Sequence, residues 1–189
     1  MMKGVCRAAA AAGLAVLISG GAFAGELADK AAEAETSLAA GDAAAALAAF
    51  DQASDAFWTA TPLQFRVATF ADSIAGFAVY QPKAGSAFHA GDTVHIYLEP
   101  VGYGFTQNGD GYAVSFTTGL EIRQGDIILG KTDNLGTLDW QGHAKSHAVH
   151  AAVNVTLPTL KPGDYSLLVT LTDTTSGKSA TTTLPFSIE

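Results

Sequence analysis

The sequence predicts a mainly β protein: an immunoglobulin-like antiparallel β-sandwich preceded by a short α-helical hairpin. Two observations carry this prediction. Residues 25–61 repeat small apolar side chains at helical spacing, and from residue 62 onward polar and apolar side chains alternate. Many short alternating segments without helices between them are typical of sandwiches and barrels. We therefore expect a signal peptide at 1–24, a helical hairpin at 25–61 and a sandwich at 62–189.

The first part has the layout of a secretory signal peptide. Lys3 and Arg7 form a basic start, an apolar run covers residues 8–18, and Ala22-Phe23-Ala24 matches the A-x-A cleavage pattern. We place the cut before Gly25. The apolar run is shorter than the roughly 20 residues that span a bilayer, which disfavours a membrane anchor. The expected location of the mature protein is therefore periplasmic or secreted.

Cleavage would change the charge and the chemistry of the chain. The only cysteine, Cys6, lies in the signal peptide, so the mature chain would have neither disulfides nor a thiolate nucleophile. Removing Lys3 and Arg7 leaves eight basic against eighteen acidic side chains, a net charge of −10. An acidic protein without a basic stripe is a poor candidate for binding nucleic acid or anionic lipid.

The helical region, residues 26–59, is rich in alanine and is broken once, at Gly41-Asp42. Gly41 can end the first helix in a left-handed conformation, and Asp42 can cap the second helix with its carboxylate. Residues 41–53 are similar to part of a tetratricopeptide repeat, but one such unit cannot bury a core of its own. Two apolar stripes have the spacing of amphipathic helices, Leu27, Ala31, Ala34 and Leu38 in the first helix and Ala46, Leu47, Phe50, Ala53 and Phe57 in the second. The preferred interpretation is an alanine-rich hairpin packed on the neighbouring β domain, and whether it covers the sandwich or swings on its linker stays open.

Strand signals fill the remainder of the chain. The alternation is clearest in four segments, 93–99, 149–157, 165–171 and 184–188. Four further segments are strand candidates: 65–70, 76–81, 114–123 and 126–129. Residues 130–142 fit the alternation poorly. We expect a long loop there, with Leu135, Leu138 and Trp140 folded back onto the core. Long loops often carry binding sites.

Two phrases of the β region resemble a known group of proteins. The first lies between Tyr80 and Tyr103 and includes Ile96-Tyr97-Leu98-Glu99-Pro100-Val101-Gly102-Tyr103; the second runs from Leu157 to Tyr165 and continues with Asp173, Ser176-Gly177-Lys178 and Phe186-Ser187-Ile188. Residues 62–189 thereby resemble exported bacterial proteins of uncharacterised function that carry an immunoglobulin-like β-sandwich behind a helical segment. The resemblance implies the fold and the exported location, and it implies no catalytic residue.

Histidines form the first candidate site, because His143, His147 and His150 fall within eight positions. On a strand that begins near His147, the side chains of His147 and His150 would lie on opposite faces and could not bind one ion together. A zinc or copper site would need His143 and His147 to converge with Asp139 or with a histidine of a neighbouring strand. The preferred interpretation is solvated polar side chains without a cofactor, and a metal-binding periplasmic module is the alternative.

Aromatic side chains form the second candidate site. Exposed rings on a sandwich can stack on sugars or anchor a protein partner, and the candidates are Tyr97, Tyr103, Tyr112 and Trp140. The chain has no G-x-S-x-G elbow, so an envelope enzyme with an unrecognised site is a second alternative. The sequence predicts a non-enzymatic binding or scaffolding module of the bacterial cell envelope. Its partner, an envelope protein or a small ligand, and its oligomeric state stay open.

Overall fold

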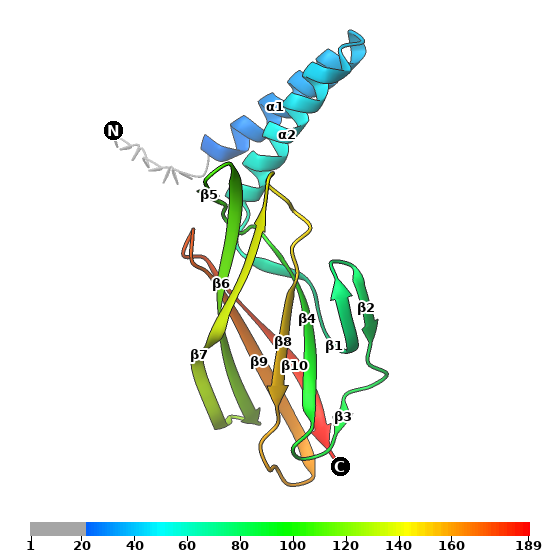
Figure 1. Cartoon of the computed structure of the whole chain (residues 1–189), viewed down its shortest axis with the longest axis vertical. Helices are drawn as coiled ribbons and strands as arrows, with labels where there is room; N and C mark the ends of the chain where they lie inside the picture. The colour runs from blue at the N-terminus through cyan, green and yellow to red at the C-terminus, as the bar shows by residue number, and fades with distance from the viewer. Residues whose placement is uncertain (1–21) are drawn as a thin grey trace, which may run out of the picture.

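The computed structural model describes residues 22–189, which form a mainly β architecture with two helices ahead of two sheets (Figure 1). Most of the predicted signal peptide, residues 1–21, lies outside the described residues. The helices are α1, Ala22–Ala39, and α2, Ala43–Ala60. They form a hairpin that projects from one end of the β region (Figure 1). No helix within residues 22–189 is long and apolar enough to cross a membrane.

The hairpin turns where the sequence predicts. Gly41 has a φ of 80°, a left-handed conformation that glycine adopts without steric cost. The Asp42 carboxylate accepts a hydrogen bond of 3.0 Å from the Ala45 N–H and so caps the first turn of α2. The prediction of two helices separated at Gly41-Asp42 is confirmed.

The hairpin buries alanines and exposes its larger apolar side chains. Four alanines recur on one face of α2 and are buried: Ala46, Ala49, Ala53 and Ala56. Leu38, Leu47, Phe50 and Phe57 are exposed. α2 packs along its length against α1 and only its end reaches the β region, so the hairpin does not cover the sheets (Figure 1).

The strands form two sheets. The four-stranded sheet has the order β2 (Val79–Pro82), β1 (Gln64–Gly76), β4 (Thr93–Val101) and β8 (Ala151–Thr156). The second sheet has the order β3 (Ala87–Phe88), β10 (Ser179–Ile188), β9 (Gly163–Asp173), β6 (Gly111–Gln124) and β5 (Thr106–Asn108), and β7 (Ile127–Gly142) also pairs with β6. The described pairings are antiparallel except the one between β3 and β10.

Side chains from both sheets share one hydrophobic core. Val94, Ile96 and Leu98 enter it from β4, and Leu167 and Val169 enter it from β9. Each is almost fully buried, which stabilises the fold by roughly 1.5–3 kcal/mol per side chain relative to exposure. The alternation in the sequence predicts this inward face correctly for both strands.

The loop predicted at residues 130–142 is wrong, because these residues belong to β7 and pair with β6. The strand lies at the edge of its sheet, and most of its side chains are exposed on both faces, so no buried face imposed an alternating pattern. Two register shifts interrupt the pairing and weaken the pattern further. Leu138 and Trp140 do pack against the core as expected, whereas Leu135 is exposed.

Candidate functional site at the base of the helical hairpin

Aromatic rings gather where α2 meets the β region. Trp58, in the last turn of α2, is only 5% exposed. Its indole packs edge-on against the Tyr103 ring at a centroid distance of 5.2 Å, and it stacks on the His147 ring at 3.9 Å. A cavity of about 300 Å³ opens beside these rings and is lined by Asp55, Trp58, Thr59, Tyr103, Gly104, Phe105, Lys145, Thr175, Ser176 and Lys178.

Gly102 brings the end of β4 against the chain that leaves α2. It has a φ of 85°, and a Cβ atom at this position would lie 2.6 Å from the Pro62 carbonyl oxygen. Tyr103 follows, and its hydroxyl donates a hydrogen bond of 2.8 Å to the Ser146 carbonyl oxygen. Burial raises the pKa of Tyr103, so its hydroxyl stays protonated as a donor. The phrase that ends in Gly102-Tyr103 therefore helps to attach α2 to the β region. We call this contact region, around Trp58, Tyr103 and His147, the joint.

Lys178 binds the carbonyl end of α2. Its ammonium donates hydrogen bonds to the carbonyl oxygens of Thr59 at 2.8 Å, Thr61 at 2.7 Å and Gly102 at 3.0 Å. The last carbonyl groups of a helix lack partners within the helix and carry partial negative charge. Three carbonyls use all three donors of the ammonium, so Lys178 attaches the hairpin to the β region and has no proton left for a ligand.

Asp173 positions the turn that carries Lys178. Its carboxylate is fully buried and accepts hydrogen bonds from the Gly104 N–H at 2.7 Å, the Thr175 N–H at 3.0 Å and the Ser176 side chain. A buried carboxylate needs such donors to offset its lost hydration. The Asp173 to Lys178 phrase is therefore a structural element of the joint.

Lys145 adds an ion pair at the rim of the cavity. Its ammonium lies 2.6 Å from an Asp55 carboxylate oxygen on α2. The same ammonium lies 6.0 Å from the centre of the Phe105 ring and 5.8 Å from that of Tyr112. Because the pair is partly exposed, its contribution to stability is about 0–1 kcal/mol. It ties the segment before β8 to the base of the hairpin.

Ser54, His147 and Asp55 approach a nucleophile, base and carboxylate set without forming one. The Ser54 Oγ lies 3.4 Å from His147 Nδ1, and an Asp55 oxygen lies 4.0 Å from His147 Nε2. Productive proton transfer needs roughly 2.6–3.2 Å. His147 Nε2 is buried without a partner, and the backbone around Ser54 is committed to the helix. In this geometry the three side chains lie together at the base of the hairpin.

The predicted metal ligands do not converge. His147 lies against Trp58, before the start of β8, because that strand begins at Ala151 instead of near His147. Asp139 is exposed on β7, and His143 lines a second cavity at the ends of β6 and β7. Among residues 22–189, no three His, Cys, Asp or Glu side chains come close enough to hold one metal ion.

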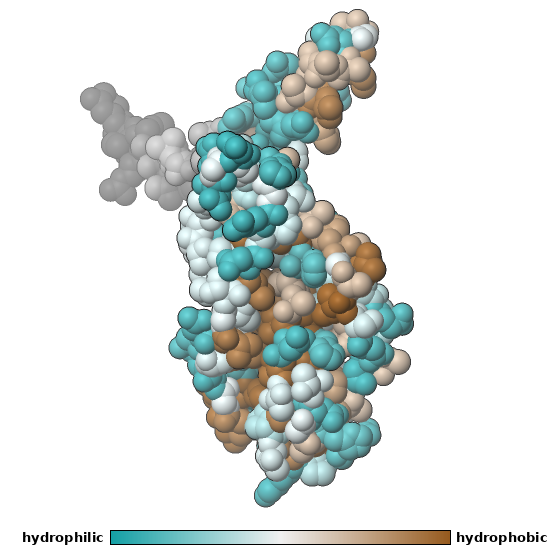
Figure 2. Space-filling view, in the orientation of Figure 1, coloured by the Kyte–Doolittle hydropathy of each residue, from teal (hydrophilic) through white to brown (hydrophobic). Residues whose placement is uncertain are grey.

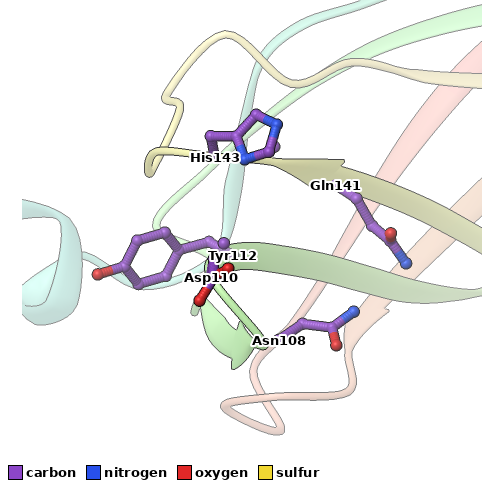
Figure 3. Close-up of a pocket in the computed structure, with 7 residues that line it drawn as sticks. Asn108, Asp110, Tyr112, Gln141 and His143 are labelled. Atoms are coloured by element: carbon purple, nitrogen blue, oxygen red, sulfur yellow. The ribbon is translucent and has the colours of Figure 1, made fainter.

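The second cavity, about 320 Å³, lies where β6 begins and β7 ends (Figure 3). Asn108 and Gln141 point their amide groups the same way, and His143 lies above them (Figure 3). The Tyr112 ring points away from these amides (Figure 3). It lies instead toward Phe105, at a centroid distance of 6.5 Å, so Tyr112 belongs to the joint at the hairpin base.

The expectation of four exposed rings is wrong for Tyr97 and Tyr103, which are 0% and 1% exposed. Tyr97 faces away from the core, as the alternation predicts, but Tyr80 of β2 covers it at a centroid distance of 3.8 Å. Its hydroxyl donates to the Glu99 carboxylate at 2.6 Å and accepts from the Ala78 N–H at 2.7 Å. Burial, and then the Glu99 hydrogen bond, raise the pKa of Tyr97 to about 12.

Tyr112 and Trp140, the other two rings of the expected aromatic patch, are half-buried, so the four rings do not form an exposed binding surface. The Trp140 ring covers Gly142, where a Cβ atom would lie 2.5 Å from the indole. Tyr103, Tyr112 and His147 of the joint were candidates in the sequence. Four other residues of the joint were not singled out as site residues: Asp55, Trp58, Lys145 and Lys178. A tryptophan in the last turn of an otherwise alanine-rich helix is the signal that could have located it.

Comparison with known proteins shows a distant similarity to a solved structure. No family model matches the chain, and no curated protein matches it. Among solved structures, the sporulation control protein Spo0M of Bacillus subtilis matches with a TM-score of 0.32 and 8% identity, over 68% of this chain and 50% of that one. The chain thus spans half the length of that protein. The class defined here is a mainly β protein of two sheets behind a two-helix hairpin.

Proposed function

We propose that the protein is an exported, non-enzymatic binding module of the bacterial cell envelope, in which an immunoglobulin-like β-sandwich presents a helical hairpin to a partner protein. One observation carries the proposal. Leu38, Leu47 and Phe50 are 66%, 61% and 62% exposed on the part of the hairpin that projects from the β region. Figure 2 shows hydrophobic side chains along one edge of this projection.

The exposure of these side chains favours a contact surface. Each large apolar side chain would gain about 1.5–3 kcal/mol on burial, and grouped exposed apolar residues commonly mark interaction sites. The hairpin does not need them for its own packing, because α1 and α2 meet through alanines such as Ala46 and Ala49. A partner is therefore the natural means of covering Leu47 and Phe50.

The base of the hairpin supports a presenting role. Lys178 holds the carbonyl end of α2 through three hydrogen bonds, and Trp58 is buried against Tyr103. These contacts hold α2 to the end of the β region, so the exposed surface is displayed in a defined direction (Figure 1). The site at the base then serves as a joint, which is consistent with a Lys178 ammonium that has no free donor.

Two features support the finer parts of the proposal. Two largely antiparallel sheets that share one core are the arrangement expected of an immunoglobulin-like sandwich. The basic start, the apolar run and the Ala22-Phe23-Ala24 exit support export. Fractionation of producing cells tests the latter: we expect periplasmic protein that begins at Gly25, and full-length protein in the cytoplasm would contradict export.

Site-specific photo-crosslinking tests the binding function. A photoreactive amino acid is placed at position 47 on α2 or, as a matched control, at position 79 on β2, where Val79 is 58% exposed. In the native bacterium we expect position 47 to give an adduct of defined mass that position 79 does not give. Equal adducts at both positions, or none at position 47, would overturn the proposal.

A further inference from the structure

We infer that the partner of the hairpin presents a basic amphipathic helix. This inference rests on the proposed binding function and adds the chemistry of the partner. The surface concerned, called the hairpin stripe, consists of four exposed side chains: Leu38, Leu47, Phe50 and Phe57. Each of the other large exposed apolar side chains among the described residues lies on the β region: Val79, Ile127, Ile128, Leu129 and Leu135.

The spacing of the stripe suits a third helix. Leu47 and Phe50 are three residues apart, and Phe57 follows Phe50 by seven, so the three share one side of α2. The alanine face of α2 is already used in the hairpin. On α2 these three side chains therefore lie beside the alanine face, where a third helix with apolar residues at i, i+3 and i+7 can pack.

The charge of the hairpin selects a cationic partner. Residues 22–60 contain seven acidic side chains and one basic side chain, a net charge of −6. The single basic group, Lys30, already pairs with Glu33 at 2.8 Å. Asp51 follows Phe50 directly and lies one helical turn after Leu47, so a carboxylate stands beside the stripe. Complementary charge favours encounter and sets the register of such a contact.

The same charge disfavours two other occupants. A second copy of this chain would bring a hairpin of net charge −6 against another of equal charge. An anionic lipid surface attracts basic segments and repels acidic ones. A lysine-rich amphipathic helix matches both the apolar stripe and the negative charge of the hairpin. Its leucines cover Leu47 and Phe50, while its cations face Asp51 and the neighbouring carboxylates.

Two synthetic peptides test the inference on the full mature chain, residues 25–189. The first is an 18-residue amphipathic helix with leucines on one face and lysines on the other, and the second carries glutamate in place of every lysine. Fluorescence anisotropy measures the affinity of each. We expect the lysine peptide to bind at least tenfold more tightly than the glutamate peptide, with an affinity that falls as salt rises.

Variants locate the binding surface. We expect Leu47→Ser with Phe50→Ser to weaken binding of the lysine peptide at least tenfold. Val79→Ser is the matched control, because it also replaces an exposed apolar side chain but lies on β2, and it should leave the affinity unchanged. Circular dichroism checks that each variant keeps its helices. Asp51→Lys is the second test: we expect weaker binding of the lysine peptide and stronger binding of the glutamate peptide.

Each outcome decides the inference. Equal binding of the two peptides, or equal loss in the Val79→Ser control, would overturn it. Self-association of the chain in sedimentation that disappears in the double variant would replace the basic helix with a second copy. Position 47 adducts together with no charge preference would leave the binding function standing and remove only the basic partner, so the two failures are distinguishable.

Discussion

The imidazole of His147 stacks on the indole of Trp58, with ring centroids 3.9 Å apart and planes inclined by 12°. This contact joins the segment before β8 to the last turn of α2. Both His147 Nε2 and Trp58 Nε1 are buried without a hydrogen-bond partner. Burial is the main cause that lowers the pKa of His147; Asp55 acts against it, and Lys145 and Arg66 add to it.

The joint should therefore weaken in acid. An unfolded histidine has a pKa of about 6.5 and takes up a proton before the folded His147 does, so stability present above that pH is lost as pH falls toward the lowered folded pKa. His147→Phe keeps a stacking ring and removes the titration. We expect its melting temperature to fall less between pH 7.5 and pH 5 than that of the parent.

His143→Gln is the matched control for this experiment, because His143 is exposed and lies outside the Trp58 contact. We expect His143→Gln to keep the pH dependence of the parent. If His147→Phe retained that same dependence, the acid sensitivity would not come from the joint.

The hydroxyl of Tyr97 should contribute to the free energy of unfolding through its two buried hydrogen bonds. Tyr97→Phe leaves the buried Glu99 carboxylate and the Ala78 N–H without their partner, which we expect to cost about 1–3 kcal/mol in the free energy of unfolding. Tyr80→Phe removes a hydroxyl from the ring stacked on it and should change stability by less than about 0.5 kcal/mol. Urea unfolding measures both, and equal effects would refute the role given to the Tyr97 hydroxyl.

Removing Lys178 should loosen the base of the hairpin. Lys178→Met leaves the Thr59, Thr61 and Gly102 carbonyl oxygens without their shared donor, at an expected cost of about 1–3 kcal/mol. We expect faster amide exchange in the last turn of α2, measured by hydrogen–deuterium exchange. Lys131→Met, which breaks the exposed pair with Asp133, is the control and should cost below about 1 kcal/mol. Unchanged exchange in Lys178→Met would argue against this attachment.

Alanine substitutions at Gly91 and Gly102 distinguish the cost of backbone strain from the cost of a steric clash, because the two glycines have similar backbone conformations. Gly91 and Gly102 have φ values of 88° and 85°, so alanine at either should cost about 1–2 kcal/mol. Only at Gly102 would the new Cβ also meet backbone, the Thr61 carbonyl oxygen at 2.7 Å. We expect Gly102→Ala to lower the melting temperature clearly more than Gly91→Ala. Equal shifts would mean that the chain beside Gly102 can move aside.

Local chemistry explains which elements the sequence predicted. The end of α1 and the start of α2 depend on Gly41 and Asp42 alone, so they were predictable. β9 buries one face, and its alternation records it; β4 alternates in the same way, although Tyr97 and Glu99 on its outer face are buried as well. β7 buries little, so its pattern was lost and residues 130–142 were expected to be a loop. Tyr97 was assigned to the correct face, but no local signal indicates that Tyr80 covers it.

The sequence by itself determined the helical break and the inward faces of the main strands, because capping and burial of alternate side chains act over a few neighbouring residues. The tertiary structure alone decided that Lys178 meets the end of α2, that His147 meets Trp58, and that Leu47 and Phe50 stay exposed. These relationships join residues 89 or more positions apart, or depend on a neighbour that is absent. Spacing along the chain does not encode such distances.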